Sequence, residues 1–567
     1  MNASPSGPRL NSPASLSWAL LSVALALPWL LATHTAPWTT FHADAALAVA
    51  LLPLAVWVTA TCPGRWPLTW PHLTLALVAL LPIVQLASEQ HTYRADALLA
   101  SLYVGGFALA ALVGAQAEAT HPERTPDTLF TSFAIAAIAS VGLVLYQWLN
   151  VEGLGMLVLP LPLGRRPVAN LGQPNLLATL LVWGLLALWW GRARGQLSPA
   201  VAVAAAAFLL VGTAATQSRA GALQVAVVAL AACVGPRAPR LLGRTAVLAL
   251  LAWFVACSLV WPGLSGALQL EPALSLEHHV DPGRRLQIWA LALDLIAQRP
   301  LFGWGWNEGA TAQLALADSG PALHLVTPYM HNLLLDLLVW NGVPLGLLIF
   351  AALAVWFVNR WRHHAPAERP LLLALTVLLL HALLELPHAY AIFLLPAGLM
   401  LGVLETRAAR PAVMRVPRAL IGSLVALLAL TLAVVVVDYF RVEADFRDTR
   451  MRNSRVGDLT PVPAPRLWLL APFGELLEVL RIEPATGLDP TTLQLMRRVA
   501  ERFPSASNLF HYAQAAALNN QPDEARRSLR LLCHLSRPDQ CQAAGEAWRS
   551  LAETRHPVLA AVTPPRQ

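Results

Sequence analysis

Long apolar runs separated by short polar stretches make up most of the chain. Each run has about 17–25 residues, the length that an α-helix needs to cross the hydrocarbon core of a bilayer. The pattern predicts an all-α polytopic membrane protein with about thirteen transmembrane helices. The runs fall near residues 16–34, 44–62, 71–88, 97–117, 128–148, 176–192, 198–216, 220–236, 243–262, 332–358, 370–386, 388–405 and 418–438.

The polar stretches between the runs suggest the domain organisation. Residues 284–298 mix Leu, Ile and Ala with Trp289 and are too short to span, so we expect a helix along the membrane interface. We predict five regions: a cytoplasmic N-terminus (1–15), a first transmembrane region (16–262), a large periplasmic loop (263–330), a second transmembrane region (331–438) and a periplasmic helical domain (439–567).

The C-terminal region has the composition of a soluble domain, with several amphipathic helices. Residues 510–515, followed by 524–527, resemble a tetratricopeptide helix pair. A plain helical cap fits this single match equally well.

Composition agrees with a membrane class. Hydrophobic residues make up 56% of the chain and charged residues 13%, with a mean hydropathy of +0.55. Soluble domains carry about 25% charged residues. The net charge of +7 does not indicate nucleic-acid binding, because the arginines lie mainly in short loops between spans. The chain has no lysine, so all 39 basic residues are arginine.

The short loops predict the orientation, because arginine-rich loops stay on the cytoplasmic side. An odd number of spans then places the N-terminus inside and the C-terminal domain outside, in the bacterial periplasm. The arginine-rich set contains Arg65, Arg124, Arg192, Arg194, Arg237, Arg240, Arg244, Arg360, Arg362, Arg369, Arg407, Arg410, Arg415 and Arg418.

A few arginines fall on the predicted outer side, where topology does not require them. An anionic ligand at the outer face would explain them. Pairing with Glu152, Asp281 or Glu308, or contact with lipid phosphates, is the structural alternative. These residues are Arg94, Arg165, Arg166, Arg219, Arg284, Arg285 and Arg299.

Two outer segments carry further polar groups. The loop 151–175 has helix-breaking Gly and Pro residues, and ends with Gln173 and Asn175 at the head of the next span. Asn175 is either the cap of that helix or part of a wet cavity. His381, Glu385, Pro387, His388 and Tyr390 cluster around a second outer turn. Ionisable groups at the ends of spans are functional candidates, although a lone histidine is often structural.

His331 stands where the long polar loop enters an apolar helix. Asn332 follows it, and Asp336 lies one turn further on. The sequence Gly342-Val343-Pro344 predicts a kink in that helix.

Two of the five cysteines, Cys533 and Cys541, lie close together in the C-terminal region. A disulfide fits if this region is outside the cytoplasm. Two separate buried thiols fit as well. No cysteine spacing matches a zinc site.

In this order, several segments resemble the signature of the O-antigen ligase/polymerase superfamily, over roughly residues 160–405. Two of them resemble its branch of bacterial protein O-oligosaccharyltransferases, also called pilin glycosylation ligases. Asp336 stands where relatives often carry Glu or Gln. The superfamily segments are 285–289, 300–305, 331–336 and 341–344, and those of the branch are 166–175, 386–390 and 394–398.

The resemblance implies a glycosyltransferase with a GT-C-like helical membrane fold in the bacterial inner membrane. Its donor would be an oligosaccharide on undecaprenyl diphosphate, and its acceptor a Ser or Thr hydroxyl of a periplasmic, pilin-like protein. No cofactor and no metal are expected, because arginines can stabilise a diphosphate leaving group by charge-assisted hydrogen bonds.

The residue roles follow from this chemistry. A hydroxyl nucleophile needs its proton accepted, and an imidazole does so near neutral pH, so His331 is the expected base. Displacement would be direct, with inversion at the anomeric carbon. The expected diphosphate ligands are Arg219 and Arg285, then Arg165, Arg166 and Arg284; the expected acceptor- or sugar-positioning residues are Gln173, Asn175, Tyr390, His388, Asn332 and Asp336.

Other functions remain open at this point. The same motifs fit an O-antigen ligase that acts on lipid A–core, or a polymerase that acts on a second lipid-linked unit. A transporter of lipid-linked sugars would carry charges in mid-span along a path through the membrane, and few are present.

Overall fold

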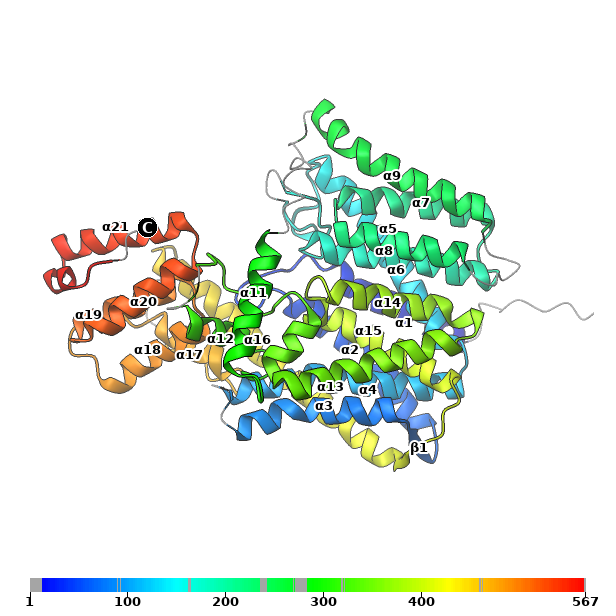
Figure 1. The fold of residues 1–567 in the computed structure, drawn as a ribbon, viewed down its shortest axis with the longest axis horizontal. Helices are drawn as coiled ribbons and strands as arrows, with labels where there is room; N and C mark the ends of the chain where they lie inside the picture. The colour runs from blue at the N-terminus through cyan, green and yellow to red at the C-terminus, as the bar shows by residue number, and fades with distance from the viewer. Residues whose placement is uncertain are drawn as a thin grey trace, which may run out of the picture. The chain divides into compact units, whose positions relative to one another are not determined.

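A computed structural model gives the fold (Figure 1). It describes residues 13–88, 90–91, 93–161, 165–234, 242–268, 270, 283–317, 320, 322–457, 460 and 462–564. Arg237, Arg240 and Asp281 lie outside the described residues, as does most of the predicted N-terminal region.

The first half of the described chain is helical apart from one short strand. Its elements are α1 (Pro13–Ala26), η1 (Leu27–Leu30), α2 (Phe41–Thr61), β1 (Arg65–Leu68), α3 (Trp70–Ala87), α4 (Arg94–Thr120), α5 (Arg124–Trp148), η2 (Gly155–Leu157), α6 (Pro174–Ala193), α7 (Pro199–Ala215), α8 (Arg219–Cys233) and α9 (Arg244–Ala267).

The second half is built in the same way. Its elements are α11 (Gly283–Gln298), α12 (Gly309–Leu316), α13 (Leu333–His363), η3 (Pro366–Glu368), α14 (Arg369–Ala382), η4 (Pro387–Ala389), α15 (Ala391–Arg407), β2 (Met414–Pro417), α16 (Arg418–Asn453), α17 (Ala471–Val479), α18 (Pro490–Arg502), α19 (Ala506–Leu518), α20 (Pro522–Leu535), α21 (Pro538–Thr554) and η5 (Pro557–Ala561).

A helix coincides with each predicted apolar run. Among the described residues, eight helices are long and apolar enough to cross a membrane: α2, α3, α4, α5, α6, α9, α13 and α16. The helices over the other runs (α1, α7, α8, α14 and α15) have 14 to 17 residues. The helical membrane class is therefore confirmed, and the count of thirteen spans stays a prediction.

The chain divides into two compact units, each described by itself below. The first unit comprises Met1–Ala79, Leu102–Asp281 and Leu353–Leu430, and the second comprises Leu80–Ser101, Pro282–Ala352 and Thr431–Gln567. Helices α3, α4, α13 and α16 contribute residues to both units.

The first unit is a bundle in which α5, α6, α7, α8 and α9 run side by side (Figure 1). The buried ring of Trp29 packs edge-on against Phe133, Trp183 and Phe393, with centroids 5.0 to 6.2 Å apart. At Gly402 of α15 a Cβ atom would overlap the carbonyl of Ala111 in α4. Such close backbone contact through small residues is typical of helices packed in membranes.

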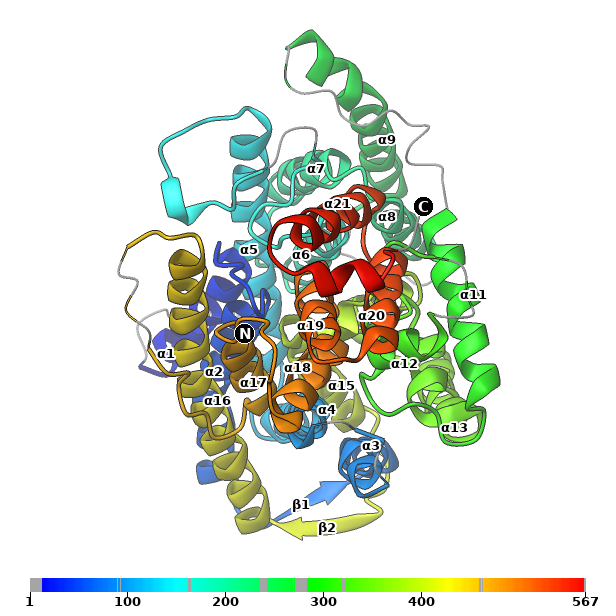
Figure 2. The ribbon, with the colours of Figure 1, turned by 90° about the vertical axis from the view of Figure 1, so that its left-hand side faces the viewer.

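A short two-stranded sheet in this unit is an addition to the predicted helical fold. Strand β1 pairs with β2 in antiparallel register, with Arg65 opposite Pro417 and Leu68 opposite Met414 (Figure 2). Each strand has four residues and the partners lie far apart in the sequence, so no local pattern indicated the pairing.

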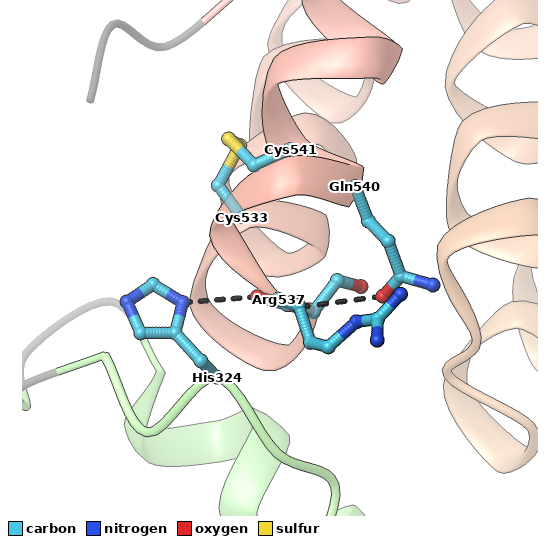
Figure 3. The surroundings of a disulfide bond; sticks show 6 residues. His324, Cys533, Arg537, Gln540 and Cys541 are labelled. Atoms are coloured by element: carbon cyan, nitrogen blue, oxygen red, sulfur yellow. Dashed lines mark hydrogen bonds between the residues drawn. A yellow bond between two sulfur atoms is a disulfide. The ribbon is translucent and has the colours of Figure 1, made fainter. Parts of the chain in front are cut away.

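In the second unit, the consecutive helices α18, α19, α20 and α21 pack on one another. Their core includes Tyr512 and Trp548, and it extends to Leu314 and Ala317 at the end of α12. A disulfide joins Cys533 in α20 to Cys541 in α21 (Figure 3). This pairing is one of the two states that the sequence left open. The amphipathic helices agree with the prediction, and the tetratricopeptide likeness stays untested.

Candidate active site

The predicted site residues fall into two groups, one in each unit. In the second unit, His331 directly follows a non-helical segment, residues 322–330, which we call the strap. His331 is half-buried and has a φ of +53°, in the left-handed region that non-glycine residues seldom occupy. It stands two residues before α13 begins.

Asn332 and Asp336 fix the backbone on both sides of His331. Asn332 Oδ1 accepts hydrogen bonds from the backbone N–H groups of Leu334 (3.0 Å) and Leu335 (3.3 Å), and so caps α13. Asp336 is fully buried, and its Oδ1 accepts from the N–H of Met330 at 2.6 Å. Both side chains were expected to position sugar or acceptor, but the structure shows them engaged with the backbone around the imidazole.

A kink in α13 supports this arrangement. Gly342 has a φ of +76°, and a Cβ there would overlap the carbonyl of Leu301. The backbone groups that the kink leaves unpaired bond to the segment 300–305. Trp304 N–H donates to Val339 O (2.8 Å), Gly305 N–H to Trp340 O (3.1 Å), and Val343 N–H to Pro300 O (2.7 Å). The predicted kink is confirmed.

Gln85 of α3 is hydrogen-bonded to the kinked part of α13 and to Trp306. Sequence reasoning missed this residue. Its buried amide donates to Trp340 O (3.0 Å) and to Asn341 Oδ1 (3.1 Å), and accepts from Trp306 N–H (2.9 Å). The signal was available, because Gln85 is a polar residue inside an apolar run.

The arginines of the second unit differ in their surroundings. Arg284 is exposed and Arg285 is half-buried, both in the first turn of α11. The Arg299 guanidinium lies 4.0 Å from the centroid of the Trp304 ring, a cation–π contact. This contact was not among the expected partners of the outer arginines, and whether Arg299 binds an anion stays untested.

In the first unit, one predicted diphosphate ligand, Arg166, contacts the turn that precedes another, Arg219, at the start of α8. Arg166 Nη1 donates to the carbonyl of Gln217 at 3.1 Å. Gln217 has a φ of +49° and precedes Ser218, whose Oγ accepts from Gly221 N–H (3.0 Å) and caps α8. Arg219, the first residue of α8, is exposed, as is Arg165. The partial positive charge of a helix N-terminus adds to these guanidinium groups, so the region favours an anion.

Asn175 links three helices beneath this turn. Ser218 Oγ donates to Asn175 Oδ1 (2.6 Å), and Asn175 Nδ2 donates to Glu385 Oε1 (3.0 Å). All three residues are buried. The side chain of Asn175 thus joins the start of α8 to the turn that follows α14, and Gln173, not Asn175, is the N-cap residue of α6.

The loop before α6 is held by neutral hydrogen bonds. Gln147 Oε1 accepts from the N–H groups of Val168 (3.1 Å) and Ala169 (2.8 Å). Asn170 Nδ2 donates to the carbonyls of Leu30 (2.7 Å) and Leu157 (2.8 Å). The buried Oε1 of Gln173 has no hydrogen-bond partner in the described part of the chain, and its expected role in positioning sugar or acceptor stays a prediction.

The second outer turn lies in the same unit. His388 in η4 and Tyr390, which precedes α15, are both half-buried. Next to them Asp44 of α2, which sequence reasoning did not single out, accepts from Ile392 N–H (3.0 Å) and Tyr103 Oη (2.8 Å). Deeper in the bundle, His381 Nδ1 lies 2.8 Å from Thr179 Oγ1.

Within the described residues, no group of three or more His, Cys, Asp or Glu side chains could hold a metal ion. The structure brings Arg166 to the turn that carries Arg219, and it sets His331 between two backbone anchors. The predicted meeting of these two groups around one ligand stays a prediction.

Comparison with known sequences bears on the class of protein. The model of the O-antigen ligase family matches residues 204–351, that of the protein glycosylation ligases matches residues 167–190, and that of the C-terminal part of virulence factor membrane-bound polymerases matches residues 370–543.

Two relatives from Acinetobacter baylyi are similar to the chain. It is 29% identical to the general O-oligosaccharyltransferase over 538 residues, which cover 92% of both chains. It is 27% identical to the ComP-specific O-oligosaccharyltransferase over 245 residues, 43% of this chain and 44% of the relative. These matches confirm the resemblance to the O-antigen ligase superfamily and to its O-oligosaccharyltransferases.

Proposed function

We propose that the protein transfers an oligosaccharide en bloc from undecaprenyl diphosphate to a Ser or Thr hydroxyl of a periplasmic, pilin-like protein. The similarity to the general O-oligosaccharyltransferase over 92% of both chains carries this proposal. The matched segment 167–190 contains the loop and helix start that Gln147, Asn170 and Asn175 hold in place.

In the proposed reaction His331 is the general base. The acceptor oxygen attacks the anomeric carbon, its proton passes to the imidazole, and the bond from that carbon to the diphosphate oxygen breaks with inversion. A base needs a fixed position, and the backbone hydrogen bonds of Asn332 and Asp336 on either side of His331 would supply one.

Arginines stabilise the departing diphosphate. Arg219 and Arg285 are the first ligands in this proposal, followed by Arg165, Arg166 and Arg284. The charge that develops on the leaving oxygen is stabilised by guanidinium groups without the need for a metal. Gln173, His388 and Tyr390 would contact sugar or acceptor, while Asn175, Asn332 and Asp336 act by positioning the backbone.

The disulfide supports the proposed location of the C-terminal domain. Structural disulfides persist in oxidising compartments such as the bacterial periplasm, and are rare in the cytosol. The Cys533–Cys541 bond therefore supports an inner-membrane protein whose C-terminal domain faces the periplasm.

Reconstitution with a defined lipid-linked glycan tests the proposal. Purified protein in liposomes, supplied with an undecaprenyl-diphosphate oligosaccharide and a pilin acceptor, should give glycosylated pilin detectable by intact-mass spectrometry. His331→Ala should lower the rate by about 10²- to 10⁴-fold while donor binding persists. If the His331→Ala variant transfers the glycan at the wild-type rate, the assignment of His331 as the base is wrong.

A polymerase is the second candidate, because residues 370–543 match the virulence factor membrane-bound polymerases. The same liposomes distinguish the two functions. Lengthened lipid-linked glycan without modified pilin would indicate a polymerase, and transfer to lipid A–core would indicate an O-antigen ligase.

A further inference from the structure

The end of the strap remote from His331 is attached to the C-terminal helical domain of the second unit. Its attachment point is His324, whose N–H donates to the carbonyl of His534 at 2.9 Å. The His324 side chain makes a second contact, between Nδ1 and the carbonyl of Ser536, also at 2.9 Å (Figure 3). Because a carbonyl only accepts, Nδ1 carries the proton in this bond.

The turn that receives His324 is closed by the disulfide. Cys533 and Cys541 are eight positions apart, and both acceptor carbonyls, of His534 and Ser536, lie between them. The cross-link joins the last turn of α20 to the first turn of α21. It therefore restricts the segment whose carbonyls hold the strap.

Between His324 and His331 the strap is held by hydrogen bonds at Leu325, Thr327, Tyr329 and Met330. Gln313 of α12 donates to Leu325 O (2.8 Å) and accepts from Thr327 N–H (2.9 Å). Thr327 Oγ1 donates to the carbonyl of Tyr329, and the next residue, Met330, is bonded to Asp336. A displacement at His324 would thus pass along a short, hydrogen-bonded segment to the imidazole.

We infer that His324 and the disulfide-closed turn 533–541 position His331 for catalysis. The C-terminal domain is on this account part of the catalytic apparatus, because it sets where the base stands. The inference rests on the proposed role of His331. His324 itself is a positioning residue and does not contact substrate.

Hydrogen exchange tests the attachment without requiring any activity. In the full-length protein, His324→Ala and Cys533→Ala/Cys541→Ala should both speed amide exchange at Thr327 and Met330. His534→Ala is the matched control, because it keeps the carbonyl that His324 uses. Unchanged exchange in both test variants would overturn the inference, whatever the activity of the protein.

Kinetics then test the consequence for catalysis. His324→Ala and the double cysteine variant should lower kcat by about 10- to 100-fold with KM for the lipid-linked donor within about twofold of wild type, because misplacement of a base slows the chemical step more than binding. His324→Asn should restore most of the rate, since its amide offers an N–H donor and Asn tolerates the φ of +50° found here. If His324→Ala speeds amide exchange in the strap but keeps the wild-type kcat, His324 does not position the base. An inactive wild type would refute the proposed function, and exchange would still decide the attachment.

Discussion

The two ends of the helices in the first unit use arginine in opposite ways. At the arginine-rich end, predicted to be cytoplasmic, Arg360 and Glu368 form a buried ion pair at 2.7 Å. Arg407 lies 2.7 Å from Glu118 and 3.0 Å from Glu123. These two arginines thus pair with protein carboxylates.

The opposite end of helices α5, α6 and α14 is built differently. Arg165 and Arg219 are exposed, and neither makes an ion pair or a side-chain hydrogen bond with any residue that the structure describes. The backbone around them is held by neutral groups, among them Gln147 and Asn175. The two ends therefore differ: Arg360 and Arg407 are paired with carboxylates, whereas Arg165 and Arg219 are the arginines that we propose bind the donor diphosphate.

The largest expected effect is on stability, at the arginine-rich end. Arg360→Ala leaves Glu368 buried without its cation and should cost about 3–5 kcal/mol of folding free energy. Thermal unfolding in detergent should show a large fall in Tm or loss of folded protein. The double variant Arg360→Met/Glu368→Leu should recover most of the stability. A wild-type Tm for Arg360→Ala would contradict the structural role.

Arg219→Ala should give the opposite phenotype. Glycan transfer should fall by about 10²- to 10³-fold, as when one donor to a developing oxyanion is removed. Tm should stay unchanged, because the side chain is exposed. Arg219→Lys keeps the charge and is the matched variant, with an intermediate rate. Comparable loss of Tm and transfer in Arg219→Ala would erase the distinction between the two ends.

Asn175→Ala should have a smaller, mixed effect. It leaves the buried Ser218 hydroxyl and Glu385 carboxylate without a shared partner, at a cost of about 1–3 kcal/mol. It also loosens the turn that carries Arg219, so we expect transfer to fall about tenfold. Transfer kinetics and thermal unfolding of one preparation measure both. Full activity together with lowered Tm would show that Asn175 does not position Arg219.

The smallest effect is expected at Arg299, which the sequence placed with the other outer arginines. Its guanidinium makes a cation–π contact with the Trp304 ring, so Arg299→Ala should lower the folding free energy by about 0.5–1 kcal/mol. Transfer should remain within about twofold of wild type on this account. Transfer assays at limiting donor would expose a hidden role, and a tenfold loss there would place Arg299 among the donor ligands.

The sequence predicted features that depend on neighbours along the chain. Apolar runs located the helices, and Gly342 with Pro344 located the kink. Features that depend on distant partners were missed. The β1–β2 pairing and the link from Asn175 to Glu385 join residues hundreds of positions apart, and no local period reports them.

The site was predicted in the same uneven way. The candidate residues were selected because ionisable side chains at the ends of membrane spans are functional candidates. Their physical roles needed coordinates, since Asn332 and Asp336 bond to backbone groups that a sequence does not place. Gln85 shows that one more polar residue within an apolar run merited attention.

Thiol cross-linking most directly tests the central claim that His331 and Arg219 serve one donor diphosphate. His331→Cys and Arg219→Cys would be combined, in membranes, in a protein whose Cys62, Cys233 and Cys257 are replaced by Ala. A short bifunctional thiol reagent should join the two cysteines, and added undecaprenyl diphosphate should block the reaction. His331→Cys with Arg362→Cys, at an exposed residue of the arginine-rich end that is predicted to be cytoplasmic, should give no product. Equal yields for the two pairs, or no product for the first, would contradict the account.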